Sequence, residues 1–563
     1  MYRSCDLLLQ KPVPRACAVI LIAVSSFTRI TSAQVSAGTS VPPASVFQPV
    51  AGLPASRAYV DYLQAFALAN EGSKPEALHL LAESLRQQPG QNPASALAFE
   101  LLMEERADTP LRLLGHTGEI TDVSYNLDGT KILTASADHT ARIWDARTGA
   151  QLTAPLEHDA AVESAAFSPD SKRVITGSVD SKVRIWDAVS GKLTSGPLSL
   201  NGAVVCVSFS PDGKMIAAGT DDGKLRTWIA MTGEPVSPVV IYHEEVYGIT
   251  FNHDGTQLLT ATGDRKAEFL DARTGRRLRR MPHGNIVFTA RFSPDEKLVV
   301  TASGDSTARI WNAQTAGPTG VVLQHGFAVH SAAFNGDASR VVTASLDHTA
   351  RVWNVSDGQP ITPLLQHPAP VGKVSFSPDG ARVATVAGDG AVRLWDSTSG
   401  DRVHLPISSD EKEPFSVFSP NGRSLLVAER TSIRVVDLPP TMVAPSWLIE
   451  LADFASTQTN YNLTRVPTIA AAQALQLRLL HENDSNPWTH FGKWYFADSG
   501  QRAISPWSDL SLESYDKMLI ARGDRKSLEY ANSLAHDFPS WSARIRPLLA
   551  KLPPDPSKRM EQN

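Results

Sequence analysis

The fold is decided by a short block that ends Ala141-Arg142-Ile143-Trp144-Asp145 and returns about every 42 residues through the middle of the chain. Its later endings are Trp186-Asp187, Trp228-Ile229, Leu270-Asp271, Trp311-Asn312, Trp353-Asn354, Trp395-Asp396 and Val436-Asp437. A fixed period of this size is typical of repeat architectures, in which each unit buries its apolar face against its neighbours. The pattern predicts eight related units in series.

Each unit contains short apolar runs separated by turn residues. In the first unit, apolar positions alternate within 120–125, 132–138 and 141–145. The turn after the first run recurs as Ser168-Pro169-Asp170 and Ser210-Pro211-Asp212-Gly213, where Pro presets φ and Asp or Gly tolerates a tight conformation. Alternation over short runs indicates strands, so each unit supplies three of them. A fourth strand is expected between units, for example at 150–152 and 363–365.

This pattern resembles the WD-repeat β-propeller family, whose signature positions are occupied by Gly115-His116 and Trp144-Asp145. The resemblance covers about residues 108–440 and implies a mainly β fold, an eight-bladed propeller with α-helical segments before and after it. The segment 110–114 could supply the eighth outer strand, pair with the last unit and close the ring, which leaves no long unpaired edge. A seven-bladed ring with the eighth unit outside it is the alternative.

In the WD-repeat family a His, a Ser or Thr, an Asp and a Trp of one blade form a buried, hydrogen-bonded tetrad. Buried polar groups need partners, and a satisfied network rigidifies its surroundings. These residues are therefore expected to be structural, although they include the side-chain types of a catalytic triad. The resemblance implies this role for His116, Ser136, Asp138 and Trp144; His158, Ser178, Asp180 and Trp186; His283, Ser303, Asp305 and Trp311; and His325, Ser345, Asp347 and Trp353.

The other four units depart from this tetrad, and the eighth has lost nearly all of it. Blades three, four and eight are therefore expected to be softer than the rest. The replacements are Leu200 for His in the third unit, Tyr242 for His and Leu270 for Trp in the fourth, and Ala387 for the hydroxyl in the seventh, where His367, Asp389 and Trp395 remain.

The N-terminus has the features of a secretion signal over residues 1–33. Three basic residues precede the apolar run 16–24, and Thr31-Ser32-Ala33 offers small residues for cleavage before Gln34. The run is short for a membrane span, which favours a cleaved signal and no stable span after cleavage. We expect a periplasmic or secreted protein. The alternatives are an anchor formed by the uncleaved segment and a wrongly assigned start codon.

Helical patterns flank the repeats. Residues 34–56 indicate a linker, because they are rich in Ala, Val, Ser and Pro. Residues 57–107 contain two amphipathic helices around a turn with Gly72, and they resemble a single tetratricopeptide repeat. A helical cap packed on the propeller is the alternative. The propeller is assigned to 108–440, and a C-terminal helical domain, again similar to a tetratricopeptide unit near its end, to 441–563.

Charge and cysteine content narrow the possible partners. The net charge is −5 and the sequence pI is about 6.3, so we predict no nucleic-acid partner, which usually needs a concentrated basic surface. The local run Arg276-Arg277 with Arg279-Arg280 is interpreted as a solvated loop between blades. Two of the three cysteines lie in the proposed signal, so Cys206 cannot form an internal disulfide in the mature chain.

The sequence contains no recognisable catalytic motif: neither a Gly-rich phosphate loop nor a nucleophile elbow nor a Cys-x-x-Cys metal pair. Many of the histidines follow the blade period rather than metal-ligand spacing. We therefore predict no catalytic residue, no metal and no cofactor.

A partner surface is expected where the inner strands begin, because this face commonly carries the partner site in the WD-repeat family. The residue five beyond the His place should point there, and the residue before each tetrad Asp should lie beside it. The first position is occupied by Thr121, Glu163, Val205, Tyr247, Phe288, His330 and Gly372. The predicted partner-binding residues are Tyr247, Phe288, His330 and Leu346, flanked by Glu163 and Asp221.

The sequence thus predicts an exported, non-enzymatic scaffold that binds a protein or peptide through the propeller face, since aromatic side chains are enriched among interface hot spots. One alternative is a propeller enzyme, a hydrolase or lyase with a site in the central channel. The other is a cytoplasmic regulatory scaffold.

Overall fold

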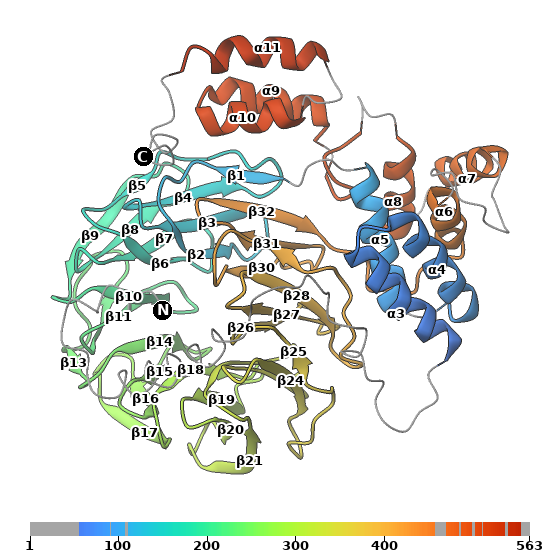
Figure 1. The fold of residues 1–563 in the computed structure, drawn as a ribbon. Helices are drawn as coiled ribbons and strands as arrows, with labels where there is room; N and C mark the ends of the chain where they lie inside the picture. Colours follow the sequence, from blue (N-terminus) through green and yellow to red (C-terminus); the bar gives the residue numbers. More distant parts are fainter. Residues whose placement is uncertain are drawn as a thin grey trace, which may run out of the picture. The chain divides into compact units, whose positions relative to one another are not determined.

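The structure is a computed structural model, and it describes residues 56–89, 92–106, 111–456, 469–482, 486–497, 502–508, 510–534 and 539–552. The proposed signal peptide and nearly all of the proposed linker lie outside these residues. The strands form eight four-stranded antiparallel sheets, arranged as blades around a central axis (Figure 1). The chain is therefore a mainly β, eight-bladed propeller with helices before and after the ring, as the sequence predicts.

Seven blades are meanders of consecutive strands, with the first strand innermost. Blades one to three are β2 (Ile120–Tyr125), β3 (Lys131–Ser136), β4 (Thr140–Asp145), β5 (Leu156–Glu157); β6 (Val162–Phe167), β7 (Arg173–Ser178), β8 (Lys182–Asp187), β9 (Leu193–Ser199); and β10 (Val204–Phe209), β11 (Met215–Thr220), β12 (Lys224–Ile229), β13 (Val240–Ile241). Blades four and five are β14 (Val246–Phe251), β15 (Gln257–Thr262), β16 (Lys266–Asp271), β17 (Arg277–Pro282); and β18 (Val287–Phe292), β19 (Leu298–Ser303), β20 (Thr307–Asn312), β21 (Pro318–Gln324). Blades six and seven are β22 (Val329–Phe334), β23 (Arg340–Ser345), β24 (Thr349–Asn354), β25 (Leu365–Gln366); and β26 (Val371–Phe376), β27 (Arg382–Ala387), β28 (Ala391–Asp396), β29 (Ile407–Ser408).

Apolar contact between neighbouring blades forms the core. The second strand of blade one, β3, is buried along almost its whole length because it has a blade on each side. Leu133 and Ile143 of blade one pack in one cluster with Val174 and Trp186 of blade two. Each tryptophan at a repeat ending thus fills the space between its own blade and the previous one, which explains why the sequence period and the blade period coincide.

The eighth blade is built from both ends of the repeat region. It contains β30 (Ser416–Phe418), β31 (Ser424–Ala428) and β32 (Ser432–Asp437), and its outer strand is β1 (Arg112–Leu114). β1 pairs antiparallel with β32 in the register Arg112↔Arg434 to Leu114↔Ser432. The prediction that an N-terminal strand closes an eight-bladed ring is confirmed, and the seven-bladed alternative is wrong.

The outer strands of blades one and six begin later than the sequence suggests. Gln151 and Pro360 make only isolated bridges with Trp144 and Trp353. The paired outer strands are β5 at 156–157 and β25 at 365–366. Residues 150–152 thus pair with β4 through one bridge and two hydrogen bonds, Asp145 N to Ala150 O and Leu152 N to Ile143 O, both 2.8 Å, and the outer strand proper follows at 156–157.

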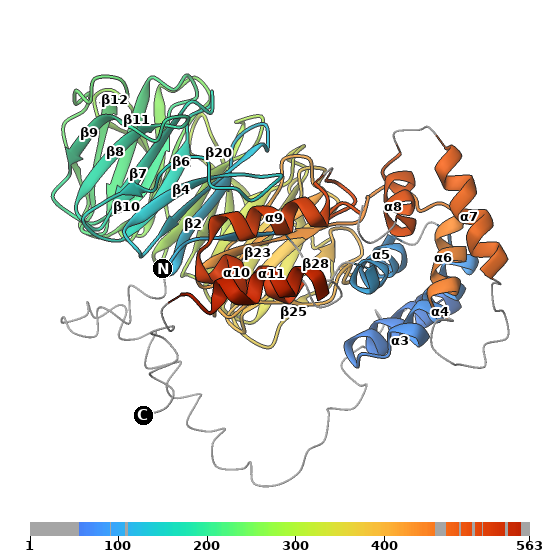
Figure 2. The same ribbon diagram turned by 90° about the horizontal axis from the view of Figure 1, so that it is seen from above.

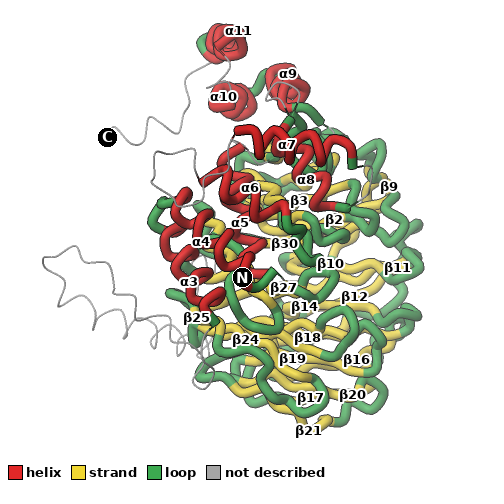
Figure 3. The backbone as a smooth tube through the Cα atoms, turned by 90° about the vertical axis from the view of Figure 1, so that its right-hand side faces the viewer, coloured by secondary structure: helices red, strands yellow, loops and turns green. Residues whose placement is uncertain are grey.

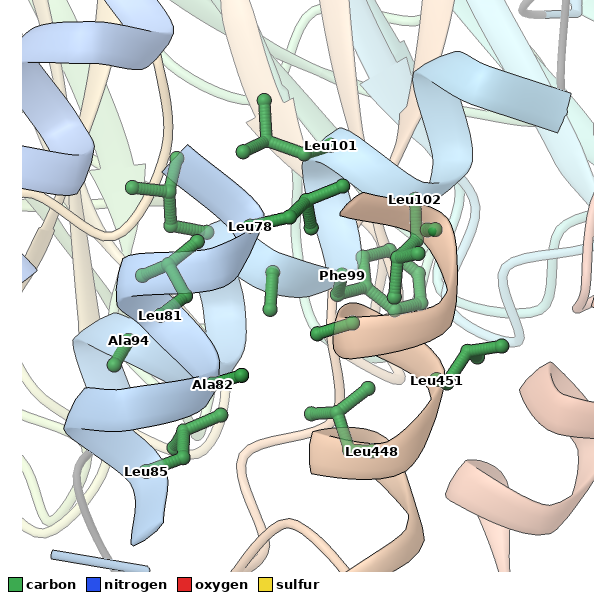
Figure 4. Packing of buried hydrophobic residues seen from close by; sticks show 14 of the residues in the cluster. Leu78, Leu81, Ala82, Leu85, Ala94, Phe99, Leu101, Leu102, Leu448 and Leu451 are labelled. Atoms are coloured by element: carbon green, nitrogen blue, oxygen red, sulfur yellow. The ribbon is translucent and has the colours of Figure 1, made fainter. Parts of the chain in front are cut away.

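Helices from both ends of the chain share one core. α3 (Arg57–Asn70), α4 (Lys74–Gln87) and α5 (Asn92–Arg106) precede the ring, and α6 (Trp447–Ser456), α7 (Ile469–His481) and α8 (Pro487–Phe496) follow it. Figure 4 shows leucines of α4 and α6 in a single buried cluster, among them Leu81 and Leu448. This helical group also contacts blade seven, where the Tyr59 hydroxyl donates to Asp401 at 2.8 Å and Glu100 accepts the Leu405 amide at 2.8 Å.

A second helical group packs on the closing blade. It consists of α9 (Leu512–Arg522), α10 (Arg525–Leu534) and α11 (Pro539–Leu549), which lie side by side in Figures 1 and 2. Tyr515 of α9 bridges the backbone of Arg112 in β1, accepting from its amide at 3.1 Å and donating to its carbonyl at 3.2 Å. Lys526 of α10 donates to the His116 carbonyl at 2.6 Å. The C-terminal helices therefore hold both β1 and the start of blade one.

Figure 3 distinguishes the strands of the ring, in yellow, from the helices of the two ends, in red. Within the described part of the chain, no helix combines the length and the apolar character that a membrane span requires. The likeness of both helical groups to tetratricopeptide units remains an interpretation of the sequence.

Candidate functional site

The histidine at the start of blade one is hydrogen-bonded inside the blade. His116 Nδ1 lies 2.8 Å from Asp138 Oδ2, and His116 Nε2 lies 2.7 Å from Thr134 Oγ1. Trp144 Nε1 donates to the same threonine hydroxyl at 2.9 Å. The hydroxyl of the tetrad therefore belongs to Thr134, and the assignment of Ser136 from the sequence is wrong. Ser136 Oγ instead accepts the Asp138 amide at 3.1 Å, which fixes the turn that carries the aspartate.

Blades two, five and six repeat this network and this correction. Ser178, Ser303 and Ser345 lie outside the tetrad and donate to backbone carbonyls of the loop that precedes the inner strand. The hydroxyls that bridge His and Trp belong to Thr176, Thr301 and Thr343, each 2.7 Å from its histidine: His158, His283 or His325. The aspartates Asp180, Asp305 and Asp347 lie 3.2, 3.0 and 3.1 Å from the same histidines, and Trp186, Trp311 and Trp353 donate to the threonines at 2.8, 2.8 and 2.7 Å.

The protonation states fit a structural role for these networks. Burial and the nearby Arg184 guanidinium lower the pKa of His158 to about 4. Burial alone raises the pKa of Asp180, but hydrogen bonds from Arg184 and the Asp159 amide outweigh it and lower that pKa to about 2. At neutral pH the histidine is neutral and the aspartate is ionised, so neither group titrates where a general acid or base works best.

Blade seven keeps the hydroxyl but changes the role of the aspartate. His367 Nε2 lies 2.7 Å from Thr385 Oγ1, so this blade retains its hydroxyl. The prediction that Ala387 replaces it is wrong. His367 Nδ1 donates to the Leu365 carbonyl at 2.8 Å, while Asp389 pairs with Arg393 at 2.5 Å. The histidine–aspartate contact is the part of the tetrad that blade seven has lost.

The partner-binding positions predicted from sequence coincide with an irregularity in the inner strands. In seven blades the pairing of the first two strands shifts at one residue, for example between Val246 and Gly248 in blade four. A bulge of this kind re-aims the extra residue out of the strict alternation. The seven re-aimed residues are Thr121, Glu163, Val205, Tyr247, Phe288, His330 and Gly372.

Three of the re-aimed side chains form a continuous row, called the aromatic row below. The ring centroids of Tyr247 and Phe288 are 5.7 Å apart in an edge-on arrangement, and those of Phe288 and His330 are 4.6 Å apart. His330 Nδ1 donates to the Gly372 carbonyl at 2.8 Å, so in the neutral ring Nε2 is an acceptor. Burial lowers the pKa of His330, which keeps the ring neutral near pH 7. The three rings are only partly buried.

Two apolar loop residues lie near the start of the inner strand of blade six. The Leu346 amide donates to the Ala328 carbonyl at 2.9 Å, and this places Leu346 beside the loop that begins the inner strand of the same blade. Phe327 precedes Ala328 and is 38 % exposed, a large apolar side chain that the sequence prediction missed. Its signal was an aromatic residue two positions after the tetrad His325, inside an otherwise polar loop.

Carboxylates border the aromatic row on the side of blades two to four. Burial, then the charges of Asp122 and Asp221, raise the pKa of Glu163. Burial and the neighbouring Asp222 raise the pKa of Asp221, whose Oδ1 accepts the Ala203 amide at 3.1 Å. Glu245, which the prediction missed, interacts with Asp221, Tyr247 and Glu163, and burial raises its pKa to about 7. The predicted flank of Glu163 and Asp221 is thus part of a larger acidic group that reaches Tyr247.

One lysine interrupts the acidic character of the inner strands. Lys373 of β26 lies with its Nζ 3.1 Å from the centroid of the Phe415 ring. Burial lowers its pKa to about 8, against the opposing influence of Glu413 and Asp122. Among the described residues, no group of three or more His, Cys, Asp or Glu side chains converges as metal ligands do.

Comparisons with known families and structures agree with this architecture. Residues 104–328 match the family model described as the IFT122 first beta-propeller, and 317–354 and 358–396 match the WD domain, G-beta repeat. The chain is similar to the crystal structure of the computationally designed Ika8 protein, with 23 % identity and a TM-score of 0.50 over 59 % of this chain and 100 % of that one. That likeness shows the fold alone. No curated protein matches the chain.

Proposed function

We propose that this protein, a WD-repeat β-propeller, is an exported, non-enzymatic scaffold that binds a segment of another protein across the aromatic row. The observation that carries the proposal is the stacking of Tyr247, Phe288 and His330 on three consecutive blades. Each ring is re-aimed by a bulge, so the row depends on backbone geometry that the repeat supplies in every blade. WD propellers generally act as protein-interaction scaffolds, which supports this assignment.

The chemistry around the row supports a partner segment that combines an apolar and a basic side chain. Partly buried aromatic rings give large contact area at low cost in side-chain entropy, and such residues dominate interface energetics. Phe327 and Leu346 extend the apolar part of the surface. After burial, the charge of Asp221 raises the pKa of Glu163, and the charges of Asp221 and Glu163 raise the pKa of Glu245. A cation from the partner would relieve this repulsion.

Export is part of the proposal and rests on the N-terminal sequence. The basic residues, the short apolar run 16–24 and the small residues at 31–33 are the features of a cleaved signal. The expected product is a periplasmic or secreted chain that begins at Gln34. Determination of the mature N-terminus checks this part by itself, and a chain that retains its first residues supports an anchor instead.

Affinity capture from the cell envelope tests the binding surface. The wild-type chain and the variants Phe288→Ala and Tyr247→Ala are used as baits, with Val205→Ala as the matched control, because Val205 occupies the same bulged position in blade three. We expect the two aromatic variants to recover about tenfold less of a protein partner than the wild-type chain, in the range of interface hot spots, and the control to recover as much as the wild type. Equal recovery by all baits of equal thermal stability contradicts the proposal.

A further inference from the structure

The outer edge of blade four differs from every other blade edge in the ring. Outer strands β9, β17 and β21 contain six or seven residues, whereas the other outer strands contain two or three. β9 and β21 carry no charged side chain; Gly196 and Pro197 interrupt β9, and Gly320 interrupts β21, which begins with Pro318. β17 carries Arg277, Arg279 and Arg280, directly after Arg276, and its only proline is its last residue.

The arginines of β17 belong to a paired strand and not to a solvated loop, which corrects the expectation from sequence. β17 pairs antiparallel with β16, with Glu268 opposite Arg280 and Phe269 opposite Arg279. Among the described residues no further strand pairs with β17, so the outer backbone groups of this strand are open (Figure 1). A strand edge of this length is a template for another extended chain.

A buried carboxylate fixes two of these arginines in place. Glu268 is completely buried and stands at a position where the other blades carry arginine. It accepts Arg277 Nε at 3.1 Å and lies 3.0 Å from Arg280 Nε and 3.3 Å from Lys266 Nζ. Lys266 Nζ also lies 3.7 Å from Asp264 Oδ2, so these three cations share two carboxylates and the edge keeps an excess of positive charge. The Arg280 side chain is still 63 % exposed and can bind a second carboxylate.

Further arginines add to this excess. Arg265, Arg273 and Arg276 are exposed, and within the described residues none of their guanidinium groups forms an ion pair or a hydrogen bond. The carboxylate next to Arg265, Asp264, accepts the His243 amide at 3.2 Å and lies 3.7 Å from Lys266 Nζ. The carboxylate nearest to Arg273 and Arg276, Asp271, accepts the Arg273 and Thr274 amides at 3.1 and 2.8 Å and the Thr274 hydroxyl at 2.8 Å. The charge of this edge is therefore opposite in sign to the net charge of −5 of the whole chain.

We propose that the outer edge of blade four binds an extended, acidic segment of a partner protein, which adds to β17 as a fifth strand. Backbone pairing along β17 supplies the register, and carboxylates of the segment bind Arg276 and Arg280. Arginines on an edge repel a second copy of the same edge and neutral strands gain nothing from them, so this edge selects a strand of opposite charge. A nucleic acid has the charge but no backbone donors and acceptors that match a strand edge.

Peptide titration tests this site. The probe is a peptide of alternating Glu and Val residues, and the comparison peptide has the same charge with a central proline. We expect the first to bind and the second to bind at least about fivefold more weakly, because proline removes a ladder donor. Equal affinity of the two peptides, or equal displacement of the first by single-stranded oligonucleotide, overturns strand addition.

Variants identify the edge. Arg273→Glu combined with Arg276→Glu should lower the affinity for the alternating peptide by about tenfold, as expected for reversal of two exposed charges. Lys192→Glu is the matched control, because Lys192 occupies the turn position of Arg276 in blade two. Phe288→Ala should leave this binding unchanged, which separates the edge from the aromatic row. Unchanged affinity in the double variant, or an equal loss in the control, overturns the proposal.

Discussion

Blades two and three hold their interiors together in different ways. In blade two, His158 lies 2.7 Å from the Thr176 hydroxyl, and Trp186 donates to the same hydroxyl at 2.8 Å. In blade three, Leu200 and Ala218 stand in the places of the histidine and the threonine, and both belong to one apolar cluster with Trp228. The tryptophan is buried in both blades. The comparison teaches that the histidine–threonine contact is dispensable when both of its members are replaced together, even though the aspartate and the tryptophan stay in place as Asp222 and Trp228.

A blade in which only the histidine or only the threonine is replaced should be less stable than a blade that keeps both or replaces both. A buried polar group that loses its partner costs about 1–3 kcal/mol, whereas replacing both partners by apolar groups of similar shape is nearly neutral. Blade three therefore need not be less stable than blade two, although the loss of its histidine predicted a softer blade from the sequence. The softness of blades three, four and eight stays a prediction, and the comparison of blades two and three is the place to test it.

The largest effect should come from the tryptophan that both blades share. Trp186→Ala and Trp228→Ala each remove a large buried side chain, and each should lower the free energy of unfolding by about 3–5 kcal/mol. Urea denaturation followed by circular dichroism measures the two losses. A much smaller loss in blade three than in blade two would show that the apolar blade is loosely packed, which contradicts the equivalence of the two designs.

Exchanging single network positions should cost less. Thr176→Ala leaves His158 Nε2 and Trp186 Nε1 without the hydroxyl that both contact and should cost about 1–3 kcal/mol. The reciprocal change, Ala218→Thr, buries a hydroxyl among apolar side chains of blade three and should cost a similar amount. Both are measured by the same denaturation. If either exchange is neutral, the network is not what distinguishes the two blades.

The double variant His158→Leu with Thr176→Ala gives blade two the residues of blade three. It removes both members of the central contact at once and should cost less than about 1.5 kcal/mol, and less than the single variant Thr176→Ala. A double-variant cycle measures the difference. A cost equal to the sum of the two single changes would mean that the two side chains act independently.

An effect of similar size is a change in acid sensitivity. The pKa of His158 is lowered from 6.5 to about 4, so the unfolded chain binds a proton in this window that the folded chain does not. Stability is therefore present above pH 6.5 and is lost as the pH falls toward 4, by about 1 kcal/mol per pH unit for this histidine. Asp180, with a pKa near 2, acts only below this window.

Comparing unfolding at pH 6.5 and pH 5 checks the sign. The wild-type chain should lose stability over this range, and the double variant His158→Leu with Thr176→Ala should lose about 1–2 kcal/mol less, since one buried histidine is gone. The other blades retain His116, His283, His325 and His367 in both chains and cancel in the comparison. An identical loss in the two chains shows that His158 is not the responsible group.

The repeat period made most of the fold predictable from the sequence. The eight endings predict eight blades, and the segment before the first repeat has the apolar residues that β1 needs to close the ring. The hydroxyl of the tetrad was assigned two residues too late, because Thr134 and Ser136 lie on the same side of β3 and alternation cannot separate them. Only the hydrogen bonds of His116 and Trp144 do so.

The candidate surface was partly visible in the sequence for the same reason. A fixed offset from the histidine finds Tyr247, Phe288 and His330, and each of them sits in a bulge that the repeat reproduces. Glu245 and Phe327 escaped because they lie in loops, where no period applies. The contacts of α9 and α10 with the closing blade were not predicted either, since Tyr515 and Lys526 contact residues about 400 positions earlier in the chain.

Blade four departs from the other blades at several positions. Tyr242 replaces the tetrad histidine, with its hydroxyl 3.2 Å from Thr260 Oγ1, and Leu270 replaces the tryptophan. The same blade carries Tyr247 at its inner end and the arginines of β17 at its outer end. A blade that differs from the consensus at its core thus differs at both of its edges, and the two proposed contacts of this scaffold meet there.

Site-specific photocrosslinking tests the central claim most directly. A photoreactive phenylalanine analogue is placed at position 288 in the full chain, and at position 205 in a matched control, and the cells that produce it are irradiated. The account predicts a discrete crosslinked protein from position 288 and none from position 205. Crosslinks of equal yield and identity from both positions, or none from position 288 in the presence of a captured partner, would contradict binding at the aromatic row.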